Sequence, residues 1–210
     1  MARARSMRRA VTIEDKGLRR QEILEAAKRV FARNGFHATT IADIAKAAHL
    51  AYGSVYWYFE SKDALFHALM DSQEAALRAH IARAMAPPAS GADGDAAADL
   101  RRAVRATFEF FEADRAATKL LFRDAYALGD RFEKHLFGIY ERFIDDIEAR
   151  IAAAQQAGHI VDAPPRVVAF SLAALIGQLA HRRLTTDDGL EAGVVADFVV
   201  TLVLQGLLPR

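Results

Sequence analysis

The chain has 210 residues, of which 52% are hydrophobic and 26% charged, and it contains no cysteine. A chain of this length buries a good core and fits one small and one larger domain, while the lack of cysteine excludes disulfides and thiol redox sensing and suits a reducing cytoplasm. The net charge of +1 hides an asymmetry: residues 1–62 carry 12 Lys and Arg against 6 Asp and Glu, whereas residues 63–210 carry 16 against 21.

Residues 1–16 form a basic tail with arginines at positions 3, 5, 8 and 9. No apolar run of signal-peptide length follows them, so we do not expect secretion. We expect the tail to be disordered. The alternative is an arm that reaches the minor groove or nearby phosphates of DNA.

Residues 17–62 are expected to form a small helical domain. Apolar residues at helical spacing predict a helix from about Gly17 to Asn34, which Gly35 ends. Thr40 stands at an N-cap position before a second, short helix. A tight turn then leads to a third helix, in which Val55 and Phe59 face inward.

The third helix is expected to turn several large side chains outward: Tyr52, Ser54, Tyr56 and Trp57. A packed domain does not normally expose so many rings without a partner. Two short helices joined in this way are typical of a motif that places a recognition helix in a DNA groove, and the basic charge favours phosphates. The alternatives are that Tyr58 and Tyr56 complete the core and that the basic charge is a solvated face.

Two stretches, 40–45 (TIADIA) and 53–65 (GSVYWYFESKDAL), resemble the N-terminal domain of the TetR/AcrR family of transcriptional repressors. The resemblance implies a homodimer that binds a palindromic operator and is released by a small ligand. It also implies roles for single positions: a phosphate contact at a helix start for Thr40, an approach to the bases for Tyr52, Gly53 and Ser54, a grip on the DNA backbone for Tyr56 and Trp57, and a phosphate contact for Lys62.

This sequence departs from the family pattern at the turn. His49 occupies a position where glycine is usual, and Ala51 replaces the Ser or Thr that caps the recognition helix. The candidate DNA-binding residues are Thr40, Ala51, Tyr52, Gly53, Ser54, Tyr56, Trp57 and Lys62.

Residues 63–210 are expected to form an effector-binding and dimerisation domain that is helical throughout. A helix that continues to Pro87-Pro88 and a loop to Asp95 are followed by helices at about 96–113, 116–128, 131–157, 164–183 and 188–207. The predicted fold is therefore all-α, with about nine helices, an N-terminal helix-turn-helix head and a C-terminal helical domain.

The last two helices are apolar around most of their circumference, so we expect burial on two sides. Pairing with the same helices of a second copy forms a four-helix bundle, with candidate interface residues Ala173, Ile176, Gly177, Phe198 and Leu202. The alternative is a core helix of a monomer. Neither helix is long and apolar enough for a membrane span.

Nine of the 19 aromatic residues lie between Phe108 and Phe143. We expect a pocket for a small hydrophobic effector, with candidate residues Phe108, Phe111, Phe122, Arg123, Tyr126, Tyr140 and Phe143. Arg123 or His135 is a candidate partner for an anionic head. The alternative is that the rings only fill the core.

No metal site, cofactor or catalytic group is expected, because the seven histidines are scattered and no phosphate loop or nucleophile elbow occurs. The favoured function is a ligand-responsive repressor whose partners are double-stranded DNA, a second copy of the chain and a small hydrophobic effector. The alternatives are a ligand-independent nucleoid or cell-division DNA-binding protein and an all-helical enzyme.

Overall fold

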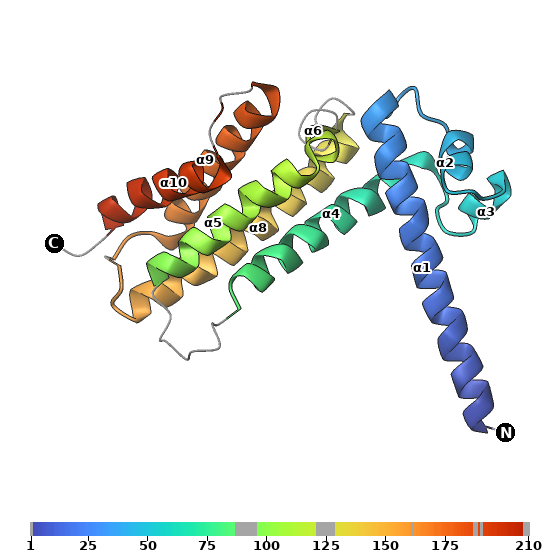
Figure 1. Ribbon diagram of the computed structural model, residues 1–210. Coiled ribbons are helices and arrows are strands. Elements are labelled where there is room, and N and C mark those ends of the chain that lie inside the picture. Colours follow the sequence, from blue (N-terminus) through green and yellow to red (C-terminus); the bar gives the residue numbers. More distant parts are fainter. Residues whose placement is uncertain are drawn as a thin grey trace. The chain divides into compact units, whose positions relative to one another are not determined.

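The computed structural model describes residues 2–86, 96–120, 129–160, 162–186, 189 and 191–207. Within these ranges the chain forms nine helices and no strand, which confirms the all-α prediction (Figure 1). The chain divides into two compact units, Met1–Ser72 and Gln73–Arg210, which we call the N-terminal unit and the C-terminal unit.

The N-terminal unit is built from α1 (Ala2–Asn34), α2 (Ile41–Ala47), α3 (Tyr52–Tyr56) and the first turns of α4 (Lys62–Ala84). Its core holds the predicted inward face of α1 and the rings of Phe31, Phe36 and Phe66, whose centroids lie 5.1–5.6 Å apart. Val55 and Phe59 are buried as predicted. One small aromatic core thus holds the helices of the N-terminal unit together.

Two boundaries differ from the sequence prediction. First, α1 begins at Ala2, where a disordered tail was expected, because no proline or glycine interrupts the chain before Gly17 and alanine and arginine are good helix formers. Second, the N-terminal unit ends after Ser72 rather than Lys62. The reason is that α4 buries apolar side chains of its first turns: Leu65, Phe66, Leu69 and Met70.

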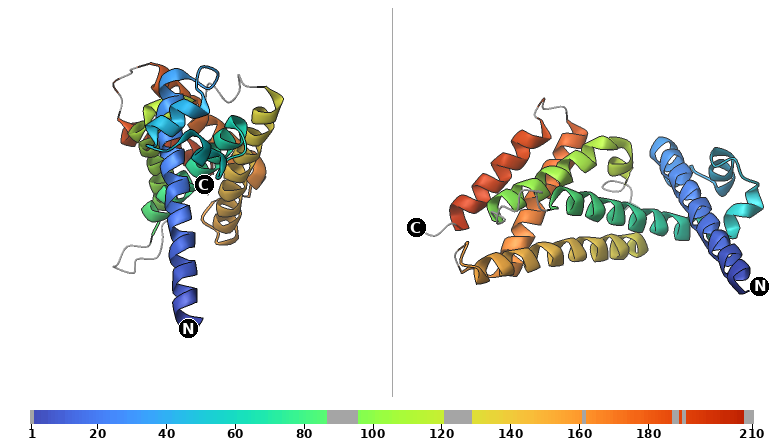
Figure 2. Two further views of the ribbon diagram at one scale, coloured as in Figure 1. Left: turned by 90° about the vertical axis from the view of Figure 1, so that its right-hand side faces the viewer. Right: turned by 60° about the horizontal axis from the view of Figure 1, so that its bottom comes forward.

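The C-terminal unit contains the rest of α4 together with α5 (Ala96–Ala113), α6 (Arg115–Lys119), α8 (Asp130–Gln156), α9 (Pro165–Thr185) and α10 (Ala192–Leu207). Helix α10 packs along α5, and α8 packs along α9 (Figures 1 and 2). Pro165 begins α9, and Gly158 follows α8 with a left-handed φ of 72°. The expected helix at 116–128 is described only up to residue 120.

Ion pairs join α4 to α8 within the C-terminal unit. Arg142 of α8 donates two hydrogen bonds to the carboxylate of Glu74, at 2.8 and 2.5 Å, and Arg78 of α4 donates to Asp146 at 2.6 Å. Both pairs are partly exposed, so each contributes little to stability on its own. They hold the two helices in register beside the apolar core. Within the described ranges no helix combines the length and the apolar character that a membrane crossing needs.

Candidate DNA-binding surface and ligand cavity

The start of α2 is fixed by a reciprocal cap. The Thr40 hydroxyl accepts from the Asp43 amide at 3.2 Å, and the Asp43 carboxylate accepts from the Thr40 amide at 2.9 Å. The hydrogen bonds from the Thr40 side chain and amide lower the pKa of the Asp43 carboxyl. The N-cap at Thr40 was predicted, whereas the contribution of Asp43 was not, although the spacing of the two residues is that of a capping box.

The turn between α2 and α3 depends on a strained histidine. His49 has φ 56°, which lies in the left-handed region that glycine adopts more easily than other residues. Its amide donates to Lys46 O at 3.2 Å, and the amide of Leu50 donates to Ala45 O at 2.9 Å. These two bonds form a Schellman motif, which ends α2 and directs the chain into α3.

The short helix α3 exposes its rings, as predicted. Tyr52 is 56% exposed, Tyr56 44% and Trp57 89%, whereas Val55 on the opposite face is fully buried. The hydroxyls of Tyr52 and Tyr56 lie 3.0 Å apart, and this hydrogen bond raises the pKa of Tyr56. The Tyr56 phenol therefore stays protonated at neutral pH. One of the two hydroxyls donates to the other, which leaves one hydroxyl hydrogen of the pair for an acceptor outside the chain.

The other predicted residues of α3 lie in the same stretch. Ala51 caps the helix without a side-chain hydrogen bond, and Ser54 is half-buried. Gly53 is exposed, has an ordinary negative φ, and a Cβ built there meets no atom within 4 Å. The fold itself does not require glycine at this position, although glycine costs a helix roughly 1 kcal/mol relative to alanine.

Lys62, the predicted phosphate contact, bonds backbone carbonyls of its own unit. Its ammonium donates to three carbonyls of the α1–α2 loop, at 2.8 Å from Phe36 O, 3.3 Å from His37 O and 2.9 Å from Thr39 O. It also lies 4.4 Å from the centroid of the Phe36 ring. An ammonium has three N–H donors, so these carbonyls use its full capacity. Lys62 therefore anchors the loop that leads into α2.

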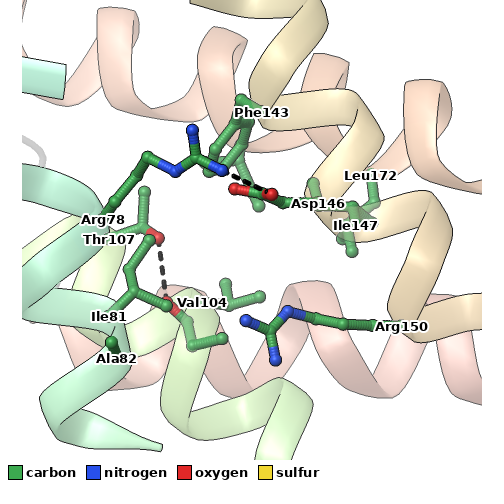
Figure 3. A pocket seen from close by; sticks show the side chains of 12 residues that line it. Arg78, Ile81, Ala82, Val104, Thr107, Phe143, Asp146, Ile147, Arg150 and Leu172 are labelled. Carbon is green, nitrogen blue, oxygen red and sulfur yellow. Dashed lines mark hydrogen bonds and ion pairs between the residues drawn. The ribbon is translucent and has the colours of Figure 1, made fainter. Parts of the chain in front are cut away.

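A cavity of about 280 Å³ lies in the C-terminal unit between α4, α5, α8 and α9 (Figure 3). Apolar side chains supply most of its wall: Ile81, Val104, Phe143, Ile147, Leu172 and Ile176. Three charged residues also line it, Arg78, Asp146 and Arg150. It is slightly smaller than the range of about 300–1,000 Å³ typical of ligand sites.

Most of the predicted ligand residues do not line this cavity. Phe143 lines the cavity, but Phe108 is buried in the core, and Phe111 and Tyr140 pack against that core. The predicted Phe122, Arg123 and Tyr126 lie outside the described residues. Aromatic density therefore located the core of the unit rather than its cavity, whose charged residues come from α4 and α8.

The predicted interface residues divide into two groups. Ala173 and Ile176 are buried in the core of their own unit, so they are not accessible to a second copy as the predicted interface requires. They lie on the face of α9 that packs inward together with Ala169 and Leu172. Gly177 is half-buried. Phe198 and Leu202 of α10 are 64% and 51% exposed, on a face of the unit that remains apolar.

Three further large apolar residues are exposed on these helices: Val167 and Phe170 on α9, and Val194 on α10. Val194, Phe198 and Leu202 are spaced four residues apart and therefore follow one line along α10. Exposed apolar patches of this kind mark interaction sites. The described residues contain no group of three or more His, Asp or Glu side chains that could hold a metal ion.

Comparisons with known proteins agree with this arrangement. Residues 23–69 match the family described as bacterial regulatory proteins, tetR family. The HTH-type transcriptional regulator TtgR of Pseudomonas putida is 45% identical over 65 residues, which are 31% of this chain. That match spans 30% of the length of TtgR.

Two solved structures share the fold over most of the chain. The fatty acid degradation regulator FadR from Bacillus halodurans has a TM-score of 0.78 and 18% identity, covering 89% of this chain and 98% of its own. The transcriptional regulator FadR from Bacillus subtilis, solved in complex with stearoyl-CoA, has a TM-score of 0.76 and 19% identity over the same shares. Residues 23–69 are therefore similar to the tetR family of bacterial regulatory proteins, and the chain shares the fold of these two solved structures over most of its length.

Proposed function

We propose that this protein is a transcriptional repressor that binds a palindromic operator as a homodimer and releases it when a small hydrophobic effector binds. The observation that carries the proposal is the exposed face of α3, where three large rings point away from a core that Val55 and Phe59 already fill. Burial within the N-terminal unit does not account for these rings. A DNA duplex does.

Each residue of this surface has a physical role toward DNA. Tyr56 donates to a phosphate oxygen, and Trp57 packs on the sugar-phosphate backbone. Gly53 lets the backbone of α3 approach a base edge or thymine methyl, which explains a glycine that the fold does not need. Thr40, at the N-terminus of α2, contacts a phosphate. These contacts position the helix, and base contacts from Tyr52 and Ser54 select the sequence.

The basic N-terminal unit supports the same partner. Arg20 of α1 lies over the ring of Phe59, 5.0 Å from its centroid. Helix α1 therefore places a positive charge beside the segment that follows α3. The arginines near the start of α1 add to this charge. Neutralised phosphates release counterions, so we expect binding that weakens steeply with salt.

A homodimer supplies the second half of the recognition. The exposed line Val194, Phe198 and Leu202 on α10, together with Val167 and Phe170 on α9, is apolar enough to pair with a second copy. A two-fold axis then holds two α3 helices at a fixed spacing and matches a palindrome. An effector that changes this spacing breaks simultaneous contact with both half-sites.

The cavity of the C-terminal unit is the proposed effector site. Helix α4 lines it with Arg78, Ile81 and Ala82, and the same helix contributes Leu65 and Phe66 to the core of the N-terminal unit. A ligand that changes the packing of α4 in the cavity therefore acts on a helix that both units share. The stearoyl-CoA of the FadR complex from Bacillus subtilis supports a ligand with an apolar chain.

Selection of DNA from a random library tests the proposal, followed by binding measurements on the selected duplex at several salt concentrations. We expect one palindromic sequence. The double variant Tyr56→Ala, Trp57→Ala should bind it at least tenfold more weakly. Phe137→Ala, which removes an exposed ring from α8, is the matched control and should bind as the wild type does. Binding to many unrelated sequences supports the nucleoid alternative instead.

A further inference from the structure

The charges that line the cavity do not balance. Asp146 and Arg150 lie one turn apart on α8, a spacing at which they commonly pair with each other. Instead Asp146 accepts from Arg78 of α4 at 2.6 Å. Among the described residues Arg150 has no hydrogen-bond or ion-pair partner. The cavity therefore has one carboxylate and two guanidiniums, of which only Arg78 is neutralised.

The unpaired charge of Arg150 lies at the cavity itself. Figure 3 shows its guanidinium extending from α8 into the opening, toward Ile81 and Val104, while Arg78 reaches Asp146 on another side of the same opening. A guanidinium beside an apolar wall gains most from a partner that supplies both a planar anion and an apolar body. Arg150 is an exposed residue, so water solvates its guanidinium in the free protein, and a neutral lipophilic ligand offers this cation no charged partner.

We propose that the effector is a single-chain amphiphile with an anionic carboxylate or phosphate head, and that Arg150 binds this head. The inference deepens the proposed function by naming the chemistry of its ligand. The apolar chain of this ligand lies against Ile81, Phe143 and Ile147, in a cavity of about 280 Å³.

The Arg78–Asp146 pair opposes this binding. Asp146 repels an anion held one turn away, and it keeps Arg78 from contributing a second guanidinium. A bound head competes with Asp146 for Arg78, and the exchange breaks a link between α4 and α8. Ligand binding thus releases the contact between Arg78 and Asp146. Arg78 belongs to α4, the helix that both units share.

Calorimetry on the 210-residue chain tests the inference with four probes of equal chain length: decanoate, decyl phosphate, decanol and decyltrimethylammonium. We expect the wild type to bind at least one of the two anions about tenfold more tightly than decanol, and the cation most weakly. The stronger of decanoate and decyl phosphate identifies the head. Equal affinity for anions and decanol overturns the inference, as does no binding of either anion.

Three variants make the assignment specific. Arg150→Gln should lower the affinity for the preferred anion about tenfold and leave decanol binding intact, which also shows that the cavity still forms. Asp146→Asn should act in the opposite direction and raise the affinity for the anion several-fold. Arg83→Gln removes an exposed arginine of α4 that does not line the cavity and should change neither. An unchanged ratio of anion to decanol affinity in Arg150→Gln contradicts the assignment.

The DNA selection described above separates this inference from the proposed function. A wild type that selects one palindrome but does not distinguish the anions from decanol retains its function and refutes the head-group inference. A wild type that prefers the anion but selects no DNA refutes the repressor proposal and leaves the ligand assignment standing.

Discussion

Replacing Lys62 by methionine tests whether this residue anchors a loop or binds a phosphate. Methionine keeps the apolar stem of lysine and removes the charge and the three donors. In the structure those donors bond three carbonyls of the loop between α1 and α2, and the bonds to Phe36 O and Thr39 O are partly buried. The third bond, to His37 O, is exposed, and water readily replaces it.

The magnitude follows from these three bonds. A hydrogen bond from a charged donor contributes about 1.5–3 kcal/mol, and less where water replaces it. Two partly buried bonds, counted at the lower end, indicate that Lys62→Met lowers the free energy of unfolding of the N-terminal unit by about 2–3 kcal/mol. For a unit of this size the melting temperature should fall by roughly 10 °C.

Thermal unfolding followed by circular dichroism measures the stability, and hydrogen exchange of the amides at 35–40 measures the loop. Lys46→Met is the matched control, because Lys46 is an exposed lysine of α2 and its loss should change stability by about 0.5 kcal/mol or less. If Lys62→Met melts with the wild type, keeps its loop protected and instead lowers the salt dependence of DNA binding by about one phosphate, the loop-anchor role is refuted.

Four further variants test single features of the two units. Gly53→Ala should stabilise the N-terminal unit by roughly 0.5–1 kcal/mol in thermal unfolding and yet weaken operator binding, because a Cβ meets nothing in the chain but separates α3 from a base; tighter binding would contradict this role. His49→Gly should raise stability by about 1 kcal/mol, since glycine adopts a φ of 56° without strain, and a lower melting temperature would refute it. Thr40→Ala should lower the free energy of unfolding by about 1 kcal/mol through loss of the cap. Because the pKa of Asp43 is lowered in the folded chain, the stability from the cap is present above the unfolded pKa of Asp43 and is lost as pH falls through the folded pKa. The melting temperature of the variant should therefore depend less on pH in this acid range than that of the wild type. Phe198→Glu should shift sedimentation to a single-chain species and weaken binding to the palindrome at least a hundredfold, whereas a stable dimer would place the interface elsewhere.

Local patterns predicted which side chains of the N-terminal unit are buried and which are exposed. Helical spacing identified the inward face of α1, and the pairing of Val55 with Phe59 correctly implied that Tyr52 and Trp57 are exposed. The positive φ at His49 followed from its place in the turn. These features depend on neighbours within a few residues, so they are visible in the sequence itself.

Long-range contacts account for the failures. Lys62 bonds carbonyls more than twenty residues away, and no local pattern indicates that its charge is already used. The cavity is assembled from four helices whose rotations depend on packing. A count of aromatic residues therefore led to Phe108 in the core and gave no sign that Arg150 lines the cavity. Ala173 and Ile176 lie on a helix that is apolar on both faces, and the sequence did not determine which face is buried within the chain.

The stoichiometry of the protein on its selected duplex tests most directly whether two linked copies of α3 read one palindrome. Native mass spectrometry and binding isotherms would be recorded on the intact palindrome, on one half-site, and on a palindrome lengthened by half a helical turn between its halves. We predict two chains on the palindrome and a loss of at least a hundredfold in affinity on each of the other two duplexes. A single chain that binds the half-site as tightly as the palindrome would contradict the account.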